Sequence, residues 1–188
     1  MPTEVELTES ARGEAWVGCS ATVATEAGPI RKRIKVHKMR PQVDLEYTFD
    51  WPIIPAGSFK AAFVTLMPDA YDPLSLYYAT HNGGSTFEVY GMHGQTIAHS
   101  APASSVVTAA TGLGATEGVV IVGDSRKALA LCFEPWACAA MPMVTFREAG
   151  PAFFARIMFS CGEMDESRTQ EVKGPLRFNC SIVGMSRQ

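Results

Sequence analysis

Strand-like runs recur along this chain about every ten to fifteen residues, separated by glycine, proline, asparagine and aspartate. This rhythm is typical of an antiparallel β-sandwich, because turn residues at such spacing leave room only for short strands. The clearest run is DLEYTFDW, residues 44–51, in which apolar and polar side chains alternate. Successive side chains of a strand point to opposite faces, so one face of this run is expected in water. The other is expected in the core, with Leu45, Tyr47, Phe49 and Trp51.

Several further runs are more apolar than this one. FKAAFVTL (59–66), GVVIVGD (118–124) and KALALCF (127–133) are apolar on both faces, which predicts strands in the middle of the sandwich. Two more strands are expected in FFARIMFS (153–160) and LRFNCSIVGM (176–185).

The segment SSVVTAATG, residues 104–112, has no clear strand pattern and suits a short helix as well as a strand with a loop. A chain of 188 residues is long enough for one sizeable core. The sequence therefore predicts an all-β fold, a single antiparallel β-sandwich domain over residues 1–188. It would have about ten to twelve strands and at most one short helix.

Charge and motifs exclude several classes of partner and cofactor. A net charge of −3 gives no general attraction to nucleic acid or to an anionic membrane. No apolar run approaches the length of a membrane span, and the polar start MPTEVELTES does not resemble a secretory signal. The five scattered cysteines are expected to be thiols of a reducing compartment, so a cytoplasmic location is predicted. No zinc-type spacing, phosphate-binding loop or dinucleotide motif is present, and we expect neither a metal nor a cofactor.

The first candidate site lies in THNGGSTFEVYG, residues 80–91. Gly83 and Gly84 with Asn82 are explained by the needs of a tight turn. Beyond the turn, Glu88 and Tyr90 share one strand face, with His81 nearby across the turn. Such a mixture of carboxylate, phenol and imidazole can bind sugar hydroxyls while an aromatic ring stacks on the sugar.

The second group of candidates surrounds an apolar strand. Glu117 and Asp124 are expected at opposite ends of it, about 23 Å apart, which is too far for one acid–base pair. A catalytic pair would have to combine different strands, for instance Glu88 with Glu117 or with Glu163. Trp136, in the proline-containing turn CFEPWACAAMP, is either a stacking platform for a sugar ring or a packing residue.

Two polar segments complete the candidates. GEMDESRTQEVKGP, residues 162–175, is expected to be a long loop in which Glu163 emerges at a sheet end, as binding residues commonly do. RKRIKVHKMR, residues 31–40, is expected to be a solvated edge strand with Ile34 and Val36 packed inward.

Taken together, the stretches 44–88, 112–124 and MFSCGEMDES (158–167) resemble the carboxyl-terminal β-sandwich region of large bacterial glycoside hydrolases of the family-57 and family-38 type. The resemblance lies in strand rhythm and turns over these stretches. It implies a supersandwich of the galactose-mutarotase type that packs against a catalytic barrel in a longer enzyme. No alternation of strands with helices of barrel type is seen here, so no catalytic residue of those enzymes is carried over.

Three hypotheses about function follow. In the first, a carbohydrate-associated module binds or positions a saccharide, or completes a glycoside hydrolase with a catalytic-barrel chain; its ligand contacts would be Asn82, Tyr90, Trp136 and Glu163. In the second, the chain is a small hydrolase, lyase or epimerase with Glu88 or Glu117 as base and His81 or His99 as acid. In the third, it is a structural protein that associates with a partner or with copies of itself.

Overall fold

The structure, a computed structural model, describes residues 5–54, 59–99, 101, 111–162 and 172–186. These residues form fifteen strands, one short α-helix and two single 3-10 turns. Three of the strands contain only two residues, so twelve have four or more. All the strand pairs described are antiparallel. The predicted all-β sandwich with at most one short helix is confirmed.

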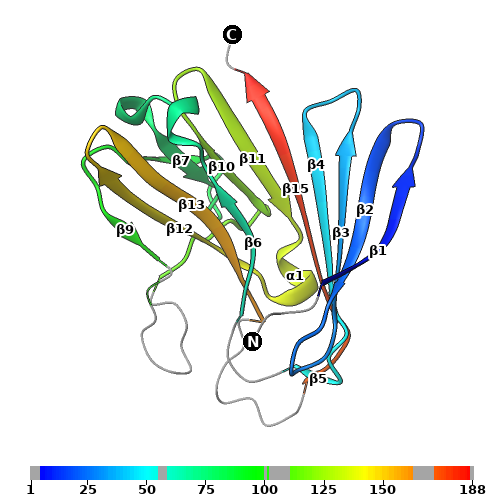
Figure 1. The fold of residues 1–188 in the computed structure, drawn as a ribbon. Coiled ribbons are helices and arrows are strands. Elements are labelled where there is room, and N and C mark those ends of the chain that lie inside the picture. Colours follow the sequence, from blue (N-terminus) through cyan, green and yellow to red (C-terminus); the bar gives the residue numbers. More distant parts are fainter. Residues whose placement is uncertain (1–4, 55–58, 100, 102–110, 163–171, 187–188) are drawn as a thin grey trace.

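Nine strands form the larger sheet (Figure 1). In spatial order they are β1 (Val5–Arg12), β2 (Trp16–Val23), β3 (Ile30–His37), β4 (Gln42–Phe49), β15 (Leu176–Ser186), β11 (Lys127–Phe133), β10 (Val119–Gly123), β7 (Tyr77–Thr80) and β8 (Glu88–Gly91). The second sheet contains β6 (Phe59–Thr65), β13 (Ala152–Cys161), β12 (Met141–Ala149) and β9 (Ile97–Ala98). A small third sheet pairs β14 (Val172–Lys173) with β5 (Ile53–Ile54), and the helix is α1 (Pro135–Cys138). The two 3-10 turns are η1 (Pro68–Ala70) and η2 (Pro73–Ser75).

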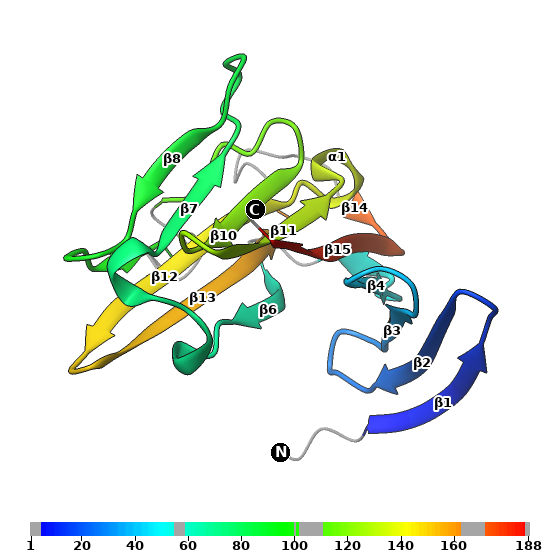
Figure 2. The same cartoon turned by 90° about the horizontal axis from the view of Figure 1, so that it is seen from above.

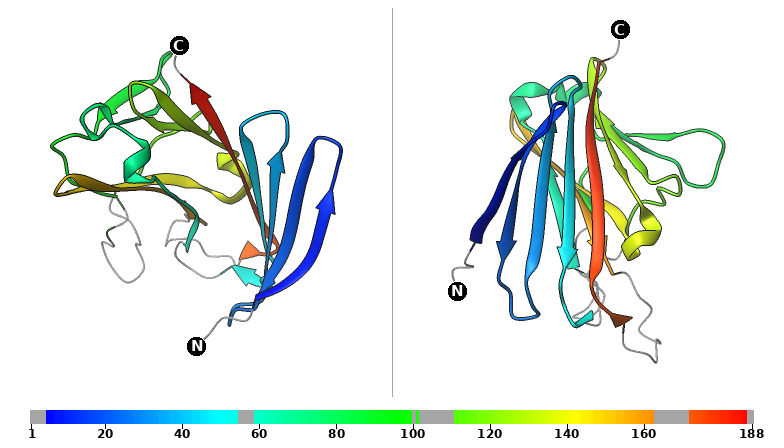
Figure 3. Two further views of the ribbon diagram at one scale, coloured as in Figure 1. Left: turned by 45° about the horizontal axis from the view of Figure 1, so that its top comes forward. Right: turned by 90° about the vertical axis from the view of Figure 1, so that its right-hand side faces the viewer.

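The second sheet covers only part of the larger one. In Figure 2, β6, β12 and β13 lie against the half that contains β7, β10, β11 and β15. Strands β1 to β3 project to one side, and Figure 3 shows them as an arm beyond β4. In the described chain, no helix is long and apolar enough to cross a membrane.

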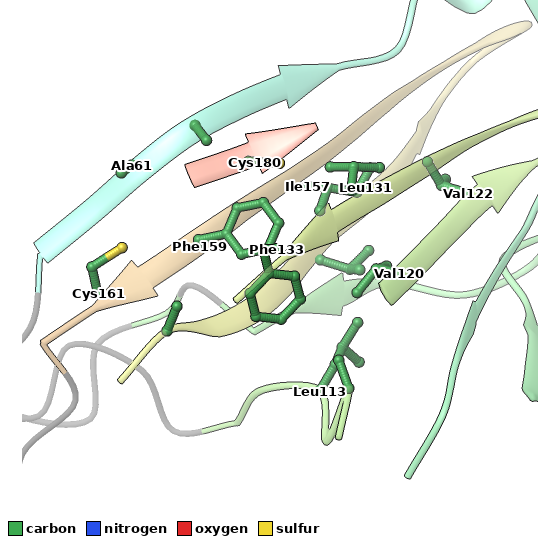
Figure 4. Packing of buried hydrophobic residues seen from close by; sticks show 14 of the residues in the cluster. Ala61, Leu113, Val120, Val122, Leu131, Phe133, Ile157, Phe159, Cys161 and Cys180 are labelled. Carbon is green, nitrogen blue, oxygen red and sulfur yellow. The ribbon is translucent and has the colours of Figure 1, made fainter. Parts of the chain in front are cut away.

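Aromatic rings join the two sheets. Phe159 of β13 lies between Phe133 of β11 and Phe178 of β15, with ring centroids 4.8 and 5.1 Å apart. Figure 4 shows Phe159 and Phe133 close together, with Val120 and other buried side chains around them. Phe159 and Phe178 are fully buried, and such rings are among the largest contributors to a hydrophobic core. The central positions predicted for the runs 118–124 and 127–133 are confirmed, because β10 and β11 each have a neighbour on both sides.

The prediction that 59–66 forms a central strand is wrong. This run forms β6, which lies at one edge of the second sheet, and its Phe63 is 54% exposed. The guanidinium group of Arg156 stands 5.6 Å from the Phe63 ring and shields part of it from water. Apolar residues on both faces therefore do not show whether a strand is covered on both sides, or whether it has one neighbour or two.

The prediction that the basic run 31–40 forms an edge strand is also wrong. Strand β3 pairs with β2 on one side and with β4 on the other. Three of its basic side chains pair across the sheet with carboxylates of β4 and of the residues that follow it. The pairs are Arg31–Asp50 at 2.5 Å, Lys35–Glu46 at 2.5 Å and His37–Asp44 at 2.7 Å. Cross-strand pairs of opposite charge permit a basic strand inside a sheet.

The inward packing predicted for this run is wrong for Val36, and Ile34 is only half-buried. Ile34 is half-buried and lies opposite Leu45, which packs against the core. Val36 is 44% exposed. Strand β3 belongs to the arm of the larger sheet, which the second sheet does not cover (Figure 2), and Val36 is exposed there.

Asp124 is a buried carboxylate that organises a turn. It follows β10, as predicted, and its side chain has no exposed surface. It accepts hydrogen bonds from the backbone N–H groups of Asp72, Arg126 and Lys127 at 2.8 to 2.9 Å. One side chain therefore joins the β10–β11 turn to the loop before β7.

Two carboxylates in this fold have a pKa below the usual aspartate value. Desolvation raises the pKa of Asp44, but hydrogen bonds from Gln42, His37 and Ser181 outweigh that effect. Desolvation also raises the pKa of Asp124, and its three backbone hydrogen bonds again outweigh it. Both groups therefore stabilise the fold in their ionised forms.

The folded protein is expected to lose stability in acid. A carboxylate whose folded pKa lies below its unfolded value of about 3.9 contributes stability above that pH, and the contribution is lost as the pH falls through the folded pKa. We expect the free energy of unfolding, measured with urea from neutral pH downward, to fall below about pH 4. Asp44→Asn should reduce this loss, and the exposed control Asp69→Asn should not. A stability that stays constant in that acid range would contradict the roles given to Asp44 and Asp124.

Candidate functional site

The β10–β11 hairpin brings two glutamates to one place. Val119 pairs with Cys132, and the Phe133 N–H donates to the Gly118 carbonyl at 2.8 Å. Continuing the register two residues beyond Val119 and Cys132 places Glu117 across from Glu134 at the open end of the hairpin. Both side chains are exposed and line the same pocket.

Gly118 makes this close approach possible. Its φ of +67° lies in the left-handed region, where a side chain is unfavourable. A Cβ atom at this position would also collide with the Phe133 carbonyl oxygen and press on the Pro135 ring. Only glycine fits here without a shift of the segment that follows β11.

Trp136 lies on that segment, in the single turn of α1. Pro135 begins the helix, and Ala139 ends it in the left-handed conformation, with its N–H donating to the Pro135 carbonyl. The Trp136 side chain is 89% exposed, so it contributes little to the core. The alternative prediction that Trp136 is a packing residue is therefore wrong, and its role as a stacking platform stays a prediction.

A pocket of about 570 Å³ lies between the Glu117 loop and α1. We call it the Trp136 pocket, and its lining includes Thr116, Glu117, Phe133, Glu134, Pro135 and Trp136. It is open to solvent and has two carboxylates beside an aromatic ring. No lysine or arginine is among its lining residues in the described chain.

The turn after β7 holds the loop that carries Glu117. The Thr116 hydroxyl donates to the His81 carbonyl at 2.9 Å and accepts from the Gly83 N–H at 2.9 Å. The Thr116 N–H also donates to the His81 carbonyl, at 2.7 Å. The Asn82 side chain lies against Gly114, where a Cβ atom would collide with its amide oxygen. His81 and Asn82 are therefore linked to the Trp136 pocket through Thr116 and Gly114.

Glu88 and Tyr90 form a separate cluster on β8. As predicted, they share one face, and the Tyr90 hydroxyl donates a hydrogen bond to the Glu88 carboxylate. This bond raises the pKa of Tyr90. Tyr90 also stacks on Tyr78, with centroids 5.0 Å apart. Glu88 is not among the described residues that line the Trp136 pocket.

The remaining candidates lie elsewhere. His81 packs edge-on against Phe87, with the ring centroids 5.7 Å apart. Phe87 directly precedes Glu88 in the chain. His99 accepts a hydrogen bond from the Val144 N–H at 3.3 Å through Nδ1, and burial lowers its pKa, which favours the neutral ring. Glu163 lies outside the described residues, as does most of the segment 104–112.

The structure thus brings Glu117 and Trp136 together, His81 and Asn82 support them, and Glu88 and Tyr90 stand apart. The catalytic roles of Glu88, Glu117 and His81 stay predictions.

The pocket combines a stacking surface with hydrogen-bond acceptors. The indole ring offers an apolar face, and ionised glutamates accept hydrogen bonds but donate none. Within the parts of the chain that are described, no group of three or more histidine, cysteine, aspartate or glutamate side chains is arranged to hold a metal ion.

Comparison with known proteins gives a likeness of fold. No protein-family model and no curated protein sequence matches the chain. Among solved structures, a quadruple mutant of the α-N-acetylgalactosaminidase NagBb from Bifidobacterium bifidum is similar over 97% of this chain, with a TM-score of 0.55 and 16% identity. The matched region is 28% of that enzyme's chain. The chain thus has the fold of one part of a glycoside hydrolase and spans little more than a quarter of its length.

Proposed function

We propose that this chain is a noncatalytic carbohydrate-binding module and that the Trp136 pocket holds a saccharide. The observation that carries the proposal is an almost fully exposed tryptophan beside two carboxylates in one open pocket. The fold shared with part of a glycoside hydrolase is consistent with it.

The chemistry of the pocket suits a sugar ring. The C–H groups on one face of a pyranose are apolar and stack on an indole ring, while its hydroxyls donate to carboxylates. Glu117 and Glu134 line the same pocket as Trp136 and would accept such bonds. Their negative charges would repel a sugar acid, so neutral saccharides are the expected ligands.

A place in a larger enzyme is part of the proposal. The strand rhythm resembles the accessory sandwiches of family-57 and family-38 type glycoside hydrolases. A supersandwich of this kind would position a glycan for a catalytic domain carried on another segment or another chain.

Replacement of Trp136 by alanine is expected to weaken saccharide binding at least tenfold, because a stacked aromatic contact is lost from the centre of the site. Isothermal titration calorimetry with α- and β-glucans, galactans and mannans would measure this loss. Phe63→Ala is a matched control, because it removes an exposed aromatic ring at the edge of the other sheet. Absence of binding heat with all of these glycans, or an equal loss in Phe63→Ala, would contradict the proposal.

A second candidate function is a small sugar-active enzyme. It is favoured by one observation, that Glu117 and Glu134 line the same pocket and could serve as an acid and a base. In a screen with aryl glycosides, the wild-type protein should then turn over at least one substrate. Both Glu117→Gln and Glu134→Gln should lower that turnover relative to the wild type. Turnover that neither change lowers would exclude these two roles.

A further inference from the structure

Two buried cysteines lie against each other beneath the Trp136 turn. Cys138 is the last residue of α1, and Cys161 is the last residue of β13. Their side chains are hydrogen-bonded to each other, and both residues belong to the hydrophobic core. Figure 4 shows the Cys161 sulfur at the end of β13. The Gly162 N–H donates to the Cys138 carbonyl at 2.8 Å, so the two main chains also meet there.

The other three cysteines are placed differently. Cys132 lies opposite Ser181, and Cys180 lies opposite Phe133, so these two thiols of neighbouring strands point to opposite faces of the sheet. Burial raises the pKa of Cys180 to about 12, which makes its thiol unreactive. Cys19 is in β2, on the projecting arm.

Cys138 is buried, but it ends a single helical turn that is otherwise largely exposed. The residues on either side of it, Ala137 and Ala139, are exposed. The turn is closed by weak or distorted elements, including a 3.3 Å hydrogen bond from the Ala137 N–H to the Glu134 carbonyl and a left-handed φ of +46° at Ala139. A short segment with few hydrogen bonds opens at low free energy, and opening this turn exposes the thiol.

We propose that Cys138 and Cys161 form a reversible disulfide when the protein meets a disulfide oxidant such as oxidised glutathione. The Cys138 thiolate attacks one sulfur of the oxidant, a mixed disulfide forms, and one glutathione thiolate leaves. The Cys161 thiolate then attacks the Cys138 sulfur and displaces the second glutathione. The two protein thiols lose two protons and two electrons, and the oxidant is reduced to two thiols.

The geometry also favours Cys138 as the first nucleophile. The hydrogen bond from Cys161 lowers the pKa of Cys138, and a thiolate is the reactive form. The resulting bond would fix the α1 turn, and with it the Trp136 ring, to the end of β13. The disulfide would form whichever ligand the Trp136 pocket binds.

The test uses the full chain, incubated in its native state with oxidised glutathione and then denatured for thiol counting. We expect a loss of two thiols and, in non-reducing peptide mapping by mass spectrometry, a link between Cys138 and Cys161. Dithiothreitol should restore both thiols. In the oxidised protein, the backbone amides of α1 should exchange hydrogen more slowly than in the reduced protein.

Single replacements provide the controls. The Cys138→Ala and Cys161→Ala variants should form no internal disulfide on incubation with oxidised glutathione. The Cys132→Ala variant should lose two thiols, as the wild-type protein does. The peptide map of the wild-type protein decides the matter even if a core variant fails to fold. A link between any other two cysteines, or no link under strongly oxidising glutathione, would overturn the proposal.

Discussion

Replacing Asp124 with alanine is expected to lower the free energy of unfolding by about 3 kcal/mol or more. The carboxylate accepts three backbone hydrogen bonds and has no exposed surface. Alanine would leave the N–H groups of Asp72, Arg126 and Lys127 without this acceptor, and a buried unsatisfied donor costs about 1–3 kcal/mol.

Urea unfolding followed by tryptophan fluorescence would measure this change. Asp69→Ala is a matched control, since it removes an exposed aspartate from η1 and should alter stability by no more than about 0.5 kcal/mol. A loss below about 1 kcal/mol in Asp124→Ala would show that the turn does not depend on the carboxylate.

Replacing Gly118 with alanine is expected to cost about 2–4 kcal/mol and to disturb the Trp136 pocket as well. The positive φ accounts for roughly 1 kcal/mol of this cost, and the collision with the Phe133 carbonyl accounts for the rest. Relief of the collision requires Phe133 and Pro135 to move, which displaces Trp136.

Gly83→Ala separates the two causes. Gly83 also has a positive φ, of +75°, but no atom lies within 4 Å of the position of its Cβ. The Gly83→Ala variant should therefore show only the loss of unfolding free energy that a positive φ causes, without the cost of a collision. Equal losses in Gly83→Ala and Gly118→Ala, measured by urea unfolding, would show that the close approach at Phe133 has no energetic importance.

The layered fold was predictable because strand rhythm and alternation are local properties of the sequence. In residues 44–51 the apolar positions predicted to face inward do so: Phe49 and Trp51 are buried, and Tyr47 packs against the core. Edge positions were not predictable in this way. Whether β3 or β6 has a second neighbour depends on the pairing of distant segments, and side-chain pattern alone does not encode it.

The site was only partly predictable, although one signal for it is present in the sequence. Glu117 and Trp136 were recognised separately, but their proximity was missed. The tight turn GDSRK between two apolar runs indicates a hairpin, and counting back from that turn pairs residue 117 with residue 134. Applying this register would have placed Glu117, Glu134 and Trp136 at one end of the hairpin.

No feature of the sequence shows that Glu88, which was predicted to pair with Glu117, lies apart from it. Glu88 lies opposite Thr80, and Thr80 lies opposite Val120, so Glu88 is two strands away from β10. The carboxylate is also held by Tyr90 on a face that it shares with Tyr78. Sequence spacing does not reveal which strands are neighbours in a sheet. For that reason the predicted acids Glu88 and Glu117 lie in separate places in the structure.

The role of Trp136 is tested most directly by following the three tryptophan indole N–H signals by NMR during titration with saccharides. A binding glycan is expected to shift the Trp136 signal while the signals of Trp16 and Trp51 stay in place. Shifts confined to the amides of β8 around Glu88 and Tyr90, or no shift of Trp136 with any glycan that binds, would contradict that role.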